Sequence, residues 1–476
     1  MTGNAPLIVW LRSDLRLSDN PALHDACLNG RPVLALYILD EETPGIRDLG
    51  GAAKWWLHHA LERLGEAFAK MGAQLILRRG TADTVLATLI NEVGAAGVYW
   101  NRCYDPPQMA RDRRIKETLK QQGLEAKSFN GSLLSEPWTI ATKAGGYYKV
   151  YTRYWQACRD QGDPPPPLPA PVQICPYQSR INSDVLNDWK LLPGTPDWAG
   201  GLRTRWQPGE DGAKSRLQDF LQGGLEGYAD GRDFPADPVT SNLSPHLHSG
   251  DISPRQIWHE TLKAVGWSQD AEKFLKELVW REFAYHVFYH LPEITEQPMQ
   301  GRFRAFPWRD DPAGLQAWQR GLTGYPMVDA GMRELWQTGQ MHNRVRMITA
   351  SFLVKHLLLS WQQGEAWFWD TLVDADLAVN AFSWQWVAGS GADAAPYFRI
   401  FNPIIQGQKF DPDGRYIRTY VPEIAGLPDK YLFQPWLAPD DVLADAGIKM
   451  GVTYPAPIVD HKLARERALA AFKSLP

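Results

Sequence analysis

The sequence predicts an α/β domain with a parallel, Rossmann-like sheet over residues 1–131, followed by an all-helical domain over residues 201–476. Two observations support this prediction. In the first part, short apolar runs alternate with stretches of helical periodicity, which is the pattern of a parallel α/β sheet. After about residue 200 the alternation disappears, and helical periodicity remains between loops that carry Gly and Pro. A chain of 476 residues is also expected to form two or three domains.

The strands of the first domain are predicted from apolar runs at residues 7–11, 33–39, 75–77 and 98–100, and a fifth strand is predicted at residues 127–129. Helical stretches are predicted at residues 52–71, 81–93 and 109–122. Residues 132–200 have weak periodicity, and the tract Pro164 to Pro167 cannot occupy a helix interior or a central strand. We therefore expect residues 132–200 to be an interdomain connector on the surface.

The composition excludes several classes of function. Four cysteines, Cys27, Cys103, Cys158 and Cys175, lie far apart without a CxxC pair, so neither a disulfide framework nor a metal site is expected. The net charge of −4 argues against non-specific coating of nucleic acid, although it permits a local basic patch. No export signal and no apolar run long enough for a membrane span are apparent, which predicts a cytoplasmic protein. The 21 tryptophans indicate either a large aromatic core or a protein that handles π-systems or electrons.

One helical segment carries a polar and aromatic cluster. Glu277, Trp280 and Arg281 stand at positions i, i+3 and i+4, so they share a helix face. A carboxylate, a large ring and a cation together form a polar-aromatic wall that suits a ligand. The alternative is a surface ion pair beside a half-buried tryptophan.

A second helical segment combines arginines with an apolar continuation. Asn343, Arg346 and Met347 share one face, and Arg344 is adjacent. Because unpaired buried charge is costly, two arginines entering an apolar helix need anionic partners, whether for function or for structure alone. Candidates for these partners are Asp374 and Asp376.

Two further segments indicate binding of a phosphorylated aromatic ligand. Consecutive hydroxyls in Thr240–Leu247, which follows Tyr228–Pro235, can bind a pyrophosphate, although Thr-Ser-Asn is more often a cap or turn. In Asn380–Pro403, Trp384 and Trp386 flank a glutamine before a Gly/Ser turn and an aromatic-Arg-aromatic segment. That mixture suits stacking of flat rings rather than core packing. No GxGxxG, GxxxxGK[ST], HExxH or GxSxG motif is present.

Taken in order, these motifs resemble those of the DNA photolyase/cryptochrome family, most closely bacterial cyclobutane pyrimidine dimer (CPD) photolyases, in a branch close to plant cryptochromes. Val9–Leu23 is similar to the N-terminal signature of the family, and Thr240–Ser244 is similar to its flavin-phosphate loop. Gly324–Ala330 and the Trp-rich block match as well. The resemblance covers nearly the whole chain. It implies an N-terminal antenna domain and an all-α domain that holds a U-shaped FAD.

The resemblance assigns FAD contacts residue by residue. Contacts to the phosphates and ribityl chain are implied for Tyr228, Thr240, Ser241, Leu243 and Ser244. Contacts to the isoalloxazine are implied for Arg346, Asp374 and Asp376, with Asn380 facing N5. CPD photolyases carry Asn at that last position, whereas plant-type cryptochromes carry Asp and insect or animal ones usually Cys. An amide there suits a reduced, anionic flavin.

The resemblance also assigns contacts to a flipped-out dimer. The residues implied to line its cavity are Glu277, Trp280, Asn343, Met347 and Trp386. The two tryptophans stack on the dimer, and Glu277 hydrogen-bonds its carbonyl edge. The phosphate contacts implied are Arg232, Arg281, Arg344 and Arg399. A chain of tryptophans that carries electrons to photo-oxidised flavin matches Trp384, Trp361 and Trp308.

The function implied is light-driven repair of CPDs in UV-damaged DNA, with electron transfer from photoexcited reduced FAD to the dimer. A cryptochrome-type photoreceptor without repair is the first alternative. A (6-4) photolyase is the second, and Met347 argues against it because (6-4) relatives carry His there. The segment Gly50–His59 resembles the branch near plant cryptochromes, which implies 5,10-methenyltetrahydrofolate as antenna, with a deazaflavin as the alternative. The family default is a monomer.

Overall fold

The computed structural model describes residues 5–393 and 398–476, which divide into two compact units. Unit 1 comprises residues 1–199, 206–225 and 241–292, and unit 2 comprises residues 200–205, 226–240 and 293–476. The domain boundaries at residues 131 and 200 stay predictions, since the two units are interleaved along the sequence. The first residues, on which the expectation about export rests, lie partly outside the described ranges.

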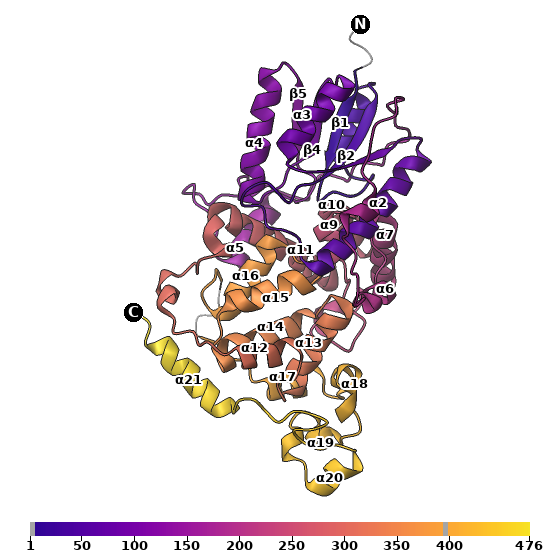
Figure 1. Cartoon of the computed structure of the whole chain (residues 1–476). Coiled ribbons are helices and arrows are strands. Elements are labelled where there is room, and N and C mark those ends of the chain that lie inside the picture. The colour runs from indigo at the N-terminus through magenta and orange to yellow at the C-terminus, as the bar shows by residue number, and fades with distance from the viewer. Residues whose placement is uncertain (1–4, 394–397) are drawn as a thin grey trace. The chain divides into compact units, whose positions relative to one another are not determined.

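Unit 1 contains a five-stranded sheet in the order β3-β2-β1-β4-β5, and every strand pair is parallel (Figure 1). The strands are β1 (Leu7–Leu11), β2 (Val33–Leu39), β3 (Leu75–Arg79), β4 (Gly97–Asn101) and β5 (Glu125–Phe129). Strand β1 pairs through Leu7 with Val33 on one side and with Gly97 on the other. Both β1 and β2 are buried over their full length, as expected for a parallel sheet with covered faces. The predicted α/β fold is confirmed.

Four helices alternate with these strands. They are α1 (Pro21–Leu28), α2 (Gly51–Lys70), α3 (Ala82–Val93) and α4 (Pro106–Gln121). The periodicity predicted the last three and missed α1. That helix nevertheless has both start signals, because Asn20 Oδ1 accepts the N–H of Leu23 at 3.1 Å and Pro21 occupies the first helical position.

The segment predicted to be a surface connector stays a prediction as a domain division, but part of it is buried. It contains α5 (Tyr151–Asp160), in which Tyr151, Tyr154 and Trp155 are buried. These aromatic residues recur at i, i+3 and i+4, so they form one helix face, and α5 packs against α11 (Gln269–His290). The proline tract beyond α5 is irregular, as predicted.

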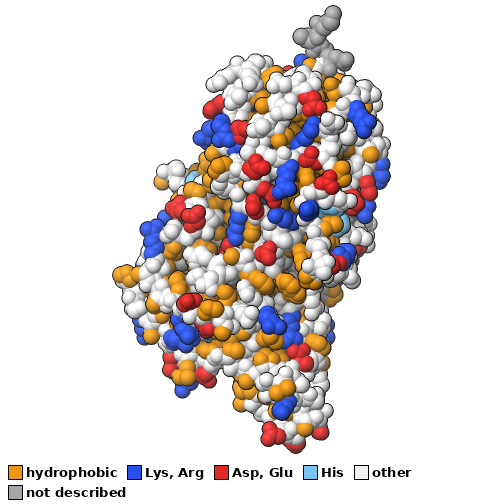
Figure 2. All heavy atoms as spheres, in the orientation of Figure 1, with side chains coloured by type: hydrophobic (Ala, Val, Ile, Leu, Met, Phe, Trp, Pro, Cys, Tyr) orange, Lys and Arg blue, Asp and Glu red, His pale blue; other side chains and the backbone are white. Residues whose placement is uncertain are grey.

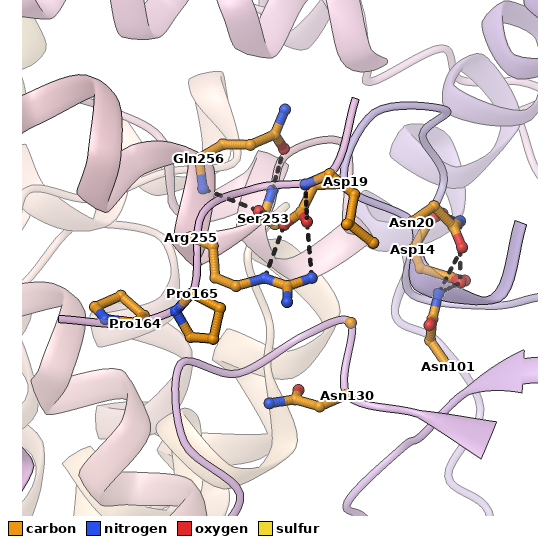
Figure 3. A network of polar contacts seen from close by, with 12 residues as sticks. Asp14, Asp19, Asn20, Asn101, Asn130, Pro164, Pro165, Ser253, Arg255 and Gln256 are labelled. Atoms are coloured by element: carbon orange, nitrogen blue, oxygen red, sulfur yellow. Dashed lines mark hydrogen bonds and ion pairs between the residues drawn. The ribbon is translucent and has the colours of Figure 1, made fainter. Parts of the chain in front are cut away.

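A buried polar network holds the N-terminal signature segment within unit 1 (Figure 3). The carboxylate of Asp19 accepts hydrogen bonds from Arg255 Nη2 at 2.7 Å and Nε at 3.0 Å, and from Ser253 Oγ at 2.5 Å. It also accepts the backbone N–H of Leu168 at 2.9 Å. The signature segment is thereby joined both to the connector and to the start of α10 (Pro254–Val265).

Unit 1 also contains the 3-10 helix η1 (Leu186–Trp189), α7 (Glu210–Asp219), the π-helical turn η2 (Phe220–Gly224) and α9 (Ser244–Ser249). The longer helices of unit 2 are α12 (Pro312–Gln319), α13 (Pro326–Thr338), α14 (Asn343–Ser351), α15 (Trp361–Thr371), α16 (Leu377–Ala388), α17 (Pro403–Phe410) and α21 (His461–Lys473). Its core is formed mainly by side chains from α12 to α16, including Trp318, Trp361 and Trp384. Unit 2 contains no strand among its described residues, which agrees with the predicted helical region.

The surface charge is mixed. On the face seen in Figure 2, basic and acidic side chains are interspersed rather than separated by sign, in keeping with a net charge of −4. None of the described helices combines the length and hydropathy that crossing a membrane requires.

Candidate functional site

Four of the predicted site residues of unit 2, Asn343, Arg344, Arg346 and Met347, lie on α14. This helix begins at Asn343 because the ring of His342 caps it, with Nδ1 accepting the N–H of Arg344 at 3.2 Å. Asn343 is exposed and Met347, one turn later on the same face, is half-buried. An amide and a thioether therefore form a mixed polar and apolar surface at this helix end.

Arg346 pairs with Asp374, one of the two anionic partners expected from the sequence. Its Nη2 lies 3.0 and 2.9 Å from the two carboxylate oxygens, and its Nε donates to the carbonyl of Met341 at 2.7 Å. Asp376, the other candidate, instead caps α16 by accepting the N–H of Val379 at 3.0 Å. The guanidinium is thus held rigidly at the same helix end as Asn343.

Asn380 is oriented by a contact between α15 and α16. Its Nδ2 donates to Glu365 Oε1 at 2.8 Å and to the Glu365 carbonyl at 3.1 Å. Both partners are acceptors, so the amide must present its NH₂ group to them. The side chain is buried, and the polar group left to meet a ligand is the Oδ1 acceptor.

Arg232 and Arg344 share an acidic residue that the sequence interpretation missed. Asp233 Oδ2 accepts a short hydrogen bond from Arg344, and Asp233 Oδ1 lies 3.9 Å from Arg232 Nε. Arg344 also packs over the ring of Phe410 at 4.4 Å. Arg399, by contrast, is exposed and lies over Phe401. Any phosphate bound by the first two arginines would have to compete with the Asp233 carboxylate.

The three tryptophans assigned to electron transfer belong to the helical core or its margin. Trp384 and Trp361 are buried, and Trp308 is partly buried. The Trp384 ring lies edge-on to Phe368 at 5.0 Å, and the glycine at position 364 makes room for it, since a β-carbon there would lie 2.1 Å from the indole. Trp386 is half-buried, and its Nε1 donates to the carbonyl of Asp393 at 3.0 Å. The remainder of this Trp-rich block includes residues 394–397, which lie outside the described residues.

The hydroxyl-rich loop makes a sharp turn. Asn242 adopts a left-handed φ of 53°, which is uncommon for a residue other than glycine, and α9 starts at Ser244. Tyr228 and Leu243 are buried, whereas Thr240 and Ser241 are half-buried. The turn therefore leaves hydroxyl groups accessible while its apolar residues are packed.

In unit 1, helix α11 carries the other predicted residues. Glu277 and Trp280 are half-buried on this helix. Arg281 Nη1 donates to the carbonyl of Ser132 at 3.0 Å and lies 3.4 Å from Glu282 Oε1. The guanidinium therefore ties the helix to the connector, a role that its spacing in the sequence did not reveal.

Glu282 is a buried carboxyl on the same helix. Its Oε2 accepts the N–H of Leu134 at 2.8 Å and of Ser135 at 3.2 Å. Burial raises the pKa of Glu282 from 4.5 to about 7, although Arg281 and the two N–H groups oppose the shift. The pKa is therefore higher in the folded chain than in the unfolded chain. Between about pH 4.5 and pH 7 the folded state holds a proton that the unfolded state has lost, so stability falls as the pH rises through this window.

Glu282→Gln is expected to remove this dependence, because an amide does not titrate and its oxygen can still accept both N–H groups. The difference in free energy of unfolding, variant minus wild type, should increase by about 2–3 kcal/mol from pH 5 to pH 8. The conversion is roughly 1.4 kcal/mol per unit of pKa shift. Urea unfolding at one-unit pH intervals measures this difference. If the free energies of unfolding of the two proteins change equally with pH, Glu282 does not titrate in this window.

The described residues contain no group of three or more His, Cys, Asp or Glu side chains arranged to hold a metal ion. The donor set is instead one of hydroxyls, an amide oxygen, carboxylates and guanidinium groups. Such groups suit an organic ligand that carries phosphates and a polar heteroaromatic ring.

Comparison with known families agrees with this arrangement. Residues 7–172 match the DNA photolyase family model, and residues 274–474 match the FAD binding domain of DNA photolyase. Together with the similarities below, which extend over the full chain, these matches show that the chain belongs to the DNA photolyase/cryptochrome family.

Three relatives illustrate the similarity. A deoxyribodipyrimidine photo-lyase of Agrobacterium fabrum is 54% identical over 99% of this chain and 98% of its own. The crystal structure of a bacterial class III photolyase from Agrobacterium tumefaciens superposes with a TM-score of 0.96 at 53% identity, and covers 100% of this chain and 98% of its own. Cryptochrome-1 of Arabidopsis thaliana is 38% identical over 98% of this chain and 70% of its own. The predicted similarity to bacterial photolyases near plant cryptochromes is confirmed.

Proposed function

We propose that the protein repairs cyclobutane pyrimidine dimers in DNA by light-driven electron transfer, as a deoxyribodipyrimidine photo-lyase. The orientation of Asn380 is the observation that carries this proposal. With its NH₂ held by Glu365, the amide offers only an acceptor at the position that the family places at flavin N5. A reduced flavin carries a hydrogen on N5 and so complements an acceptor, and the reduced form is the one that donates an electron to a lesion.

The residues present fit FAD. Hydroxyls of Thr240, Ser241 and Ser244 suit its phosphates and ribityl chain, and the Arg346–Asp374 pair offers a fixed donor and acceptor to the ring edge. Tyr228, Leu243 and Asp376 complete the proposed contacts. When bound, FAD supplies the light absorption and the one-electron chemistry, while the protein positions it and tunes its surroundings.

Residues of the chain would then hold the lesion. Photolyases are among the enzymes that extrude their target base from the stack, and the cost of roughly a few kcal/mol is smallest for a damaged base. Trp280 and Trp386 would supply the stacking surfaces, and Glu277 would supply a hydrogen-bond acceptor. Asn343 and Met347 would line the rest of the lesion cavity. Proposed contacts to the DNA phosphates are Arg232, Arg281, Arg344 and Arg399, and binding should weaken as salt rises.

Glu277→Ala is expected to weaken binding of a dimer-containing oligonucleotide about ten- to hundredfold, the value of a hydrogen bond to a charged group. Flavin content should stay unchanged, because no FAD contact is assigned to this residue. Titrations in the dark with damaged and undamaged oligonucleotides measure the effect. Glu272→Ala is the matched control, since Glu272 lies on the same helix and pairs with Lys276. Equal loss of flavin and of lesion binding would show that Glu277 is structural.

We further propose 5,10-methenyltetrahydrofolate as the antenna chromophore. The reason is that Gly50–His59, which includes the start of α2, resembles the same segment in the branch near plant cryptochromes. At the carboxyl edge of the sheet, where open α/β sheets usually bind ligands, Arg12 pairs with Asp112 at 2.6 Å and Arg111 with Asp40 at 3.0 Å. A chromophore at that edge would have to displace these buried charges. Mass spectrometry of the chromophores released from the purified protein tests the identity, and a deazaflavin would contradict it.

The function itself is tested with an oligonucleotide that carries one thymine cyclobutane dimer, using flavin-loaded protein under reducing conditions. We expect loss of the dimer in light and none in the dark, and no repair of a parallel (6-4) substrate. If fully reduced protein binds flavin but repairs neither lesion, a photoreceptor function is favoured, in line with the similarity to plant cryptochromes.

A further inference from the structure

Trp280 is one member of a stacked aromatic pair within unit 1. Its ring lies on that of Tyr151 with centroids 3.7 Å apart and planes 8° from parallel. Phe283 meets both rings edge-on, at 5.8 Å from Trp280 and 5.9 Å from Tyr151. One face of the Trp280 indole is therefore covered by the Tyr151 ring, which fixes the plane of the indole.

Tyr151 is held both by the stacking of its ring and by a hydrogen bond of its hydroxyl. Its hydroxyl donates to the carbonyl of Lys276 at 2.6 Å, one turn before Trp280 on α11, and the residue is only 7% exposed. The distance between the ring of Tyr151 and the helix axis is thus set by a hydrogen bond as well as by stacking. The hydroxyl bond would be lost in Tyr151→Phe, whereas the stacked ring would remain.

The segment that leads to Tyr151 is fastened to α11 by two buried side chains. Glu282 accepts the N–H groups of Leu134 and Ser135, as described above. One turn later, His286 Nε2 accepts the N–H of Tyr148 at 3.0 Å, and its Nδ1 lies 3.1 Å from the carbonyl of Pro137. Burial lowers the pKa of His286 to about 4, so the neutral ring serves as acceptor at one nitrogen and donor at the other. The connector is therefore held along the same helix that carries Trp280.

We propose that Tyr151 is a positioning residue for lesion binding, which holds the Trp280 ring in one plane for stacking on the flipped dimer. This inference rests on the proposed repair function. If a half-buried tryptophan could change rotamer before binding, the lesion would have to fix it in one rotamer. The conformational entropy lost in that step would weaken binding. The Tyr151 stack orders the ring beforehand. Tyr151 does not touch the lesion, so it acts on affinity and not on the photochemical step.

The test is a double-mutant cycle with Tyr151→Leu and Trp280→Ala, measured as dissociation constants in the dark for oligonucleotides with and without one thymine dimer. Tyr151→Leu should weaken dimer binding about two- to tenfold, the range expected for one aromatic pair. Binding of undamaged DNA, flavin content and repair yield at saturating substrate should be unchanged. In the Trp280→Ala background, Tyr151→Leu should cause no further loss, because the residue acts through that ring. Tyr151→Phe should restore most of the affinity.

Three results would overturn the inference: full additivity of the two substitutions, equal weakening on undamaged DNA, or wild-type dimer affinity in Tyr151→Leu. Thermal unfolding of each variant separates a folding defect from a binding defect, and Tyr151→Phe gives a second reading if the leucine variant folds poorly. Failure of the repair function is distinct from these results, because wild-type protein would then show neither preference for the dimer nor repair.

Discussion

Asp19→Asn is expected to lower the free energy of unfolding by about 3–5 kcal/mol, the usual cost of removing one partner from a buried ion pair. Asp19 is fully buried, and its carboxylate satisfies Arg255, Ser253 and the backbone of Leu168 together. An amide has the same shape but no charge, so Arg255 would be left without its counter-ion. The NH₂ group of the new asparagine, which is itself a donor, would also face one or more of the donors that now bond to Asp19.

Urea unfolding, followed by far-ultraviolet circular dichroism, measures this change. Asp25→Asn is the matched control, because Asp25 pairs with Lys127 at 2.9 Å on the exposed surface of the same unit. Loss of an exposed pair should cost about 0–1 kcal/mol. Similar effects of the two substitutions would show that the buried network contributes no more than a surface ion pair.

Trp384→Phe is expected to abolish photoreduction of the bound oxidised flavin, while repair by chemically pre-reduced protein stays close to wild type. A phenyl ring gives up an electron far less readily than an indole, so the predicted tryptophan chain would be interrupted at its first member. Absorbance of the flavin during blue illumination follows photoreduction, and the dimer oligonucleotide assay follows repair.

Trp318→Phe is the control for a change in core packing. Trp318 is also fully buried, and it lies edge-on to Trp384 at 6.2 Å, but it is outside the predicted chain. Photoreduction should survive in this variant. If both variants lose photoreduction equally, or if Trp384→Phe abolishes repair by pre-reduced protein, the electron-transfer assignment is wrong.

The sequence was a good guide wherever one local pattern dominates. The apolar runs at 7–11 and 33–39 became β1 and β2 with the same bounds, because a buried parallel strand needs a continuous apolar run. It was a poor guide in the connector, where the aromatic face of α5 was overlooked among turn residues and prolines. The site residues came from resemblance to a family, and their types alone left structural alternatives open.

The amino-acid sequence by itself determined the parallel α/β order, the helical remainder, the family and the residue types available to a flavin and a lesion. Only the tertiary structure decided which partner each polar or aromatic side chain has. Asp233 pairs with Arg344, Glu365 orients Asn380, and Tyr151 stacks on Trp280. Each pair joins residues from different helices or loops. The physical reason is that such hydrogen bonds and stacks depend on how helices pack in three dimensions, and local periodicity specifies only which face of each helix is buried.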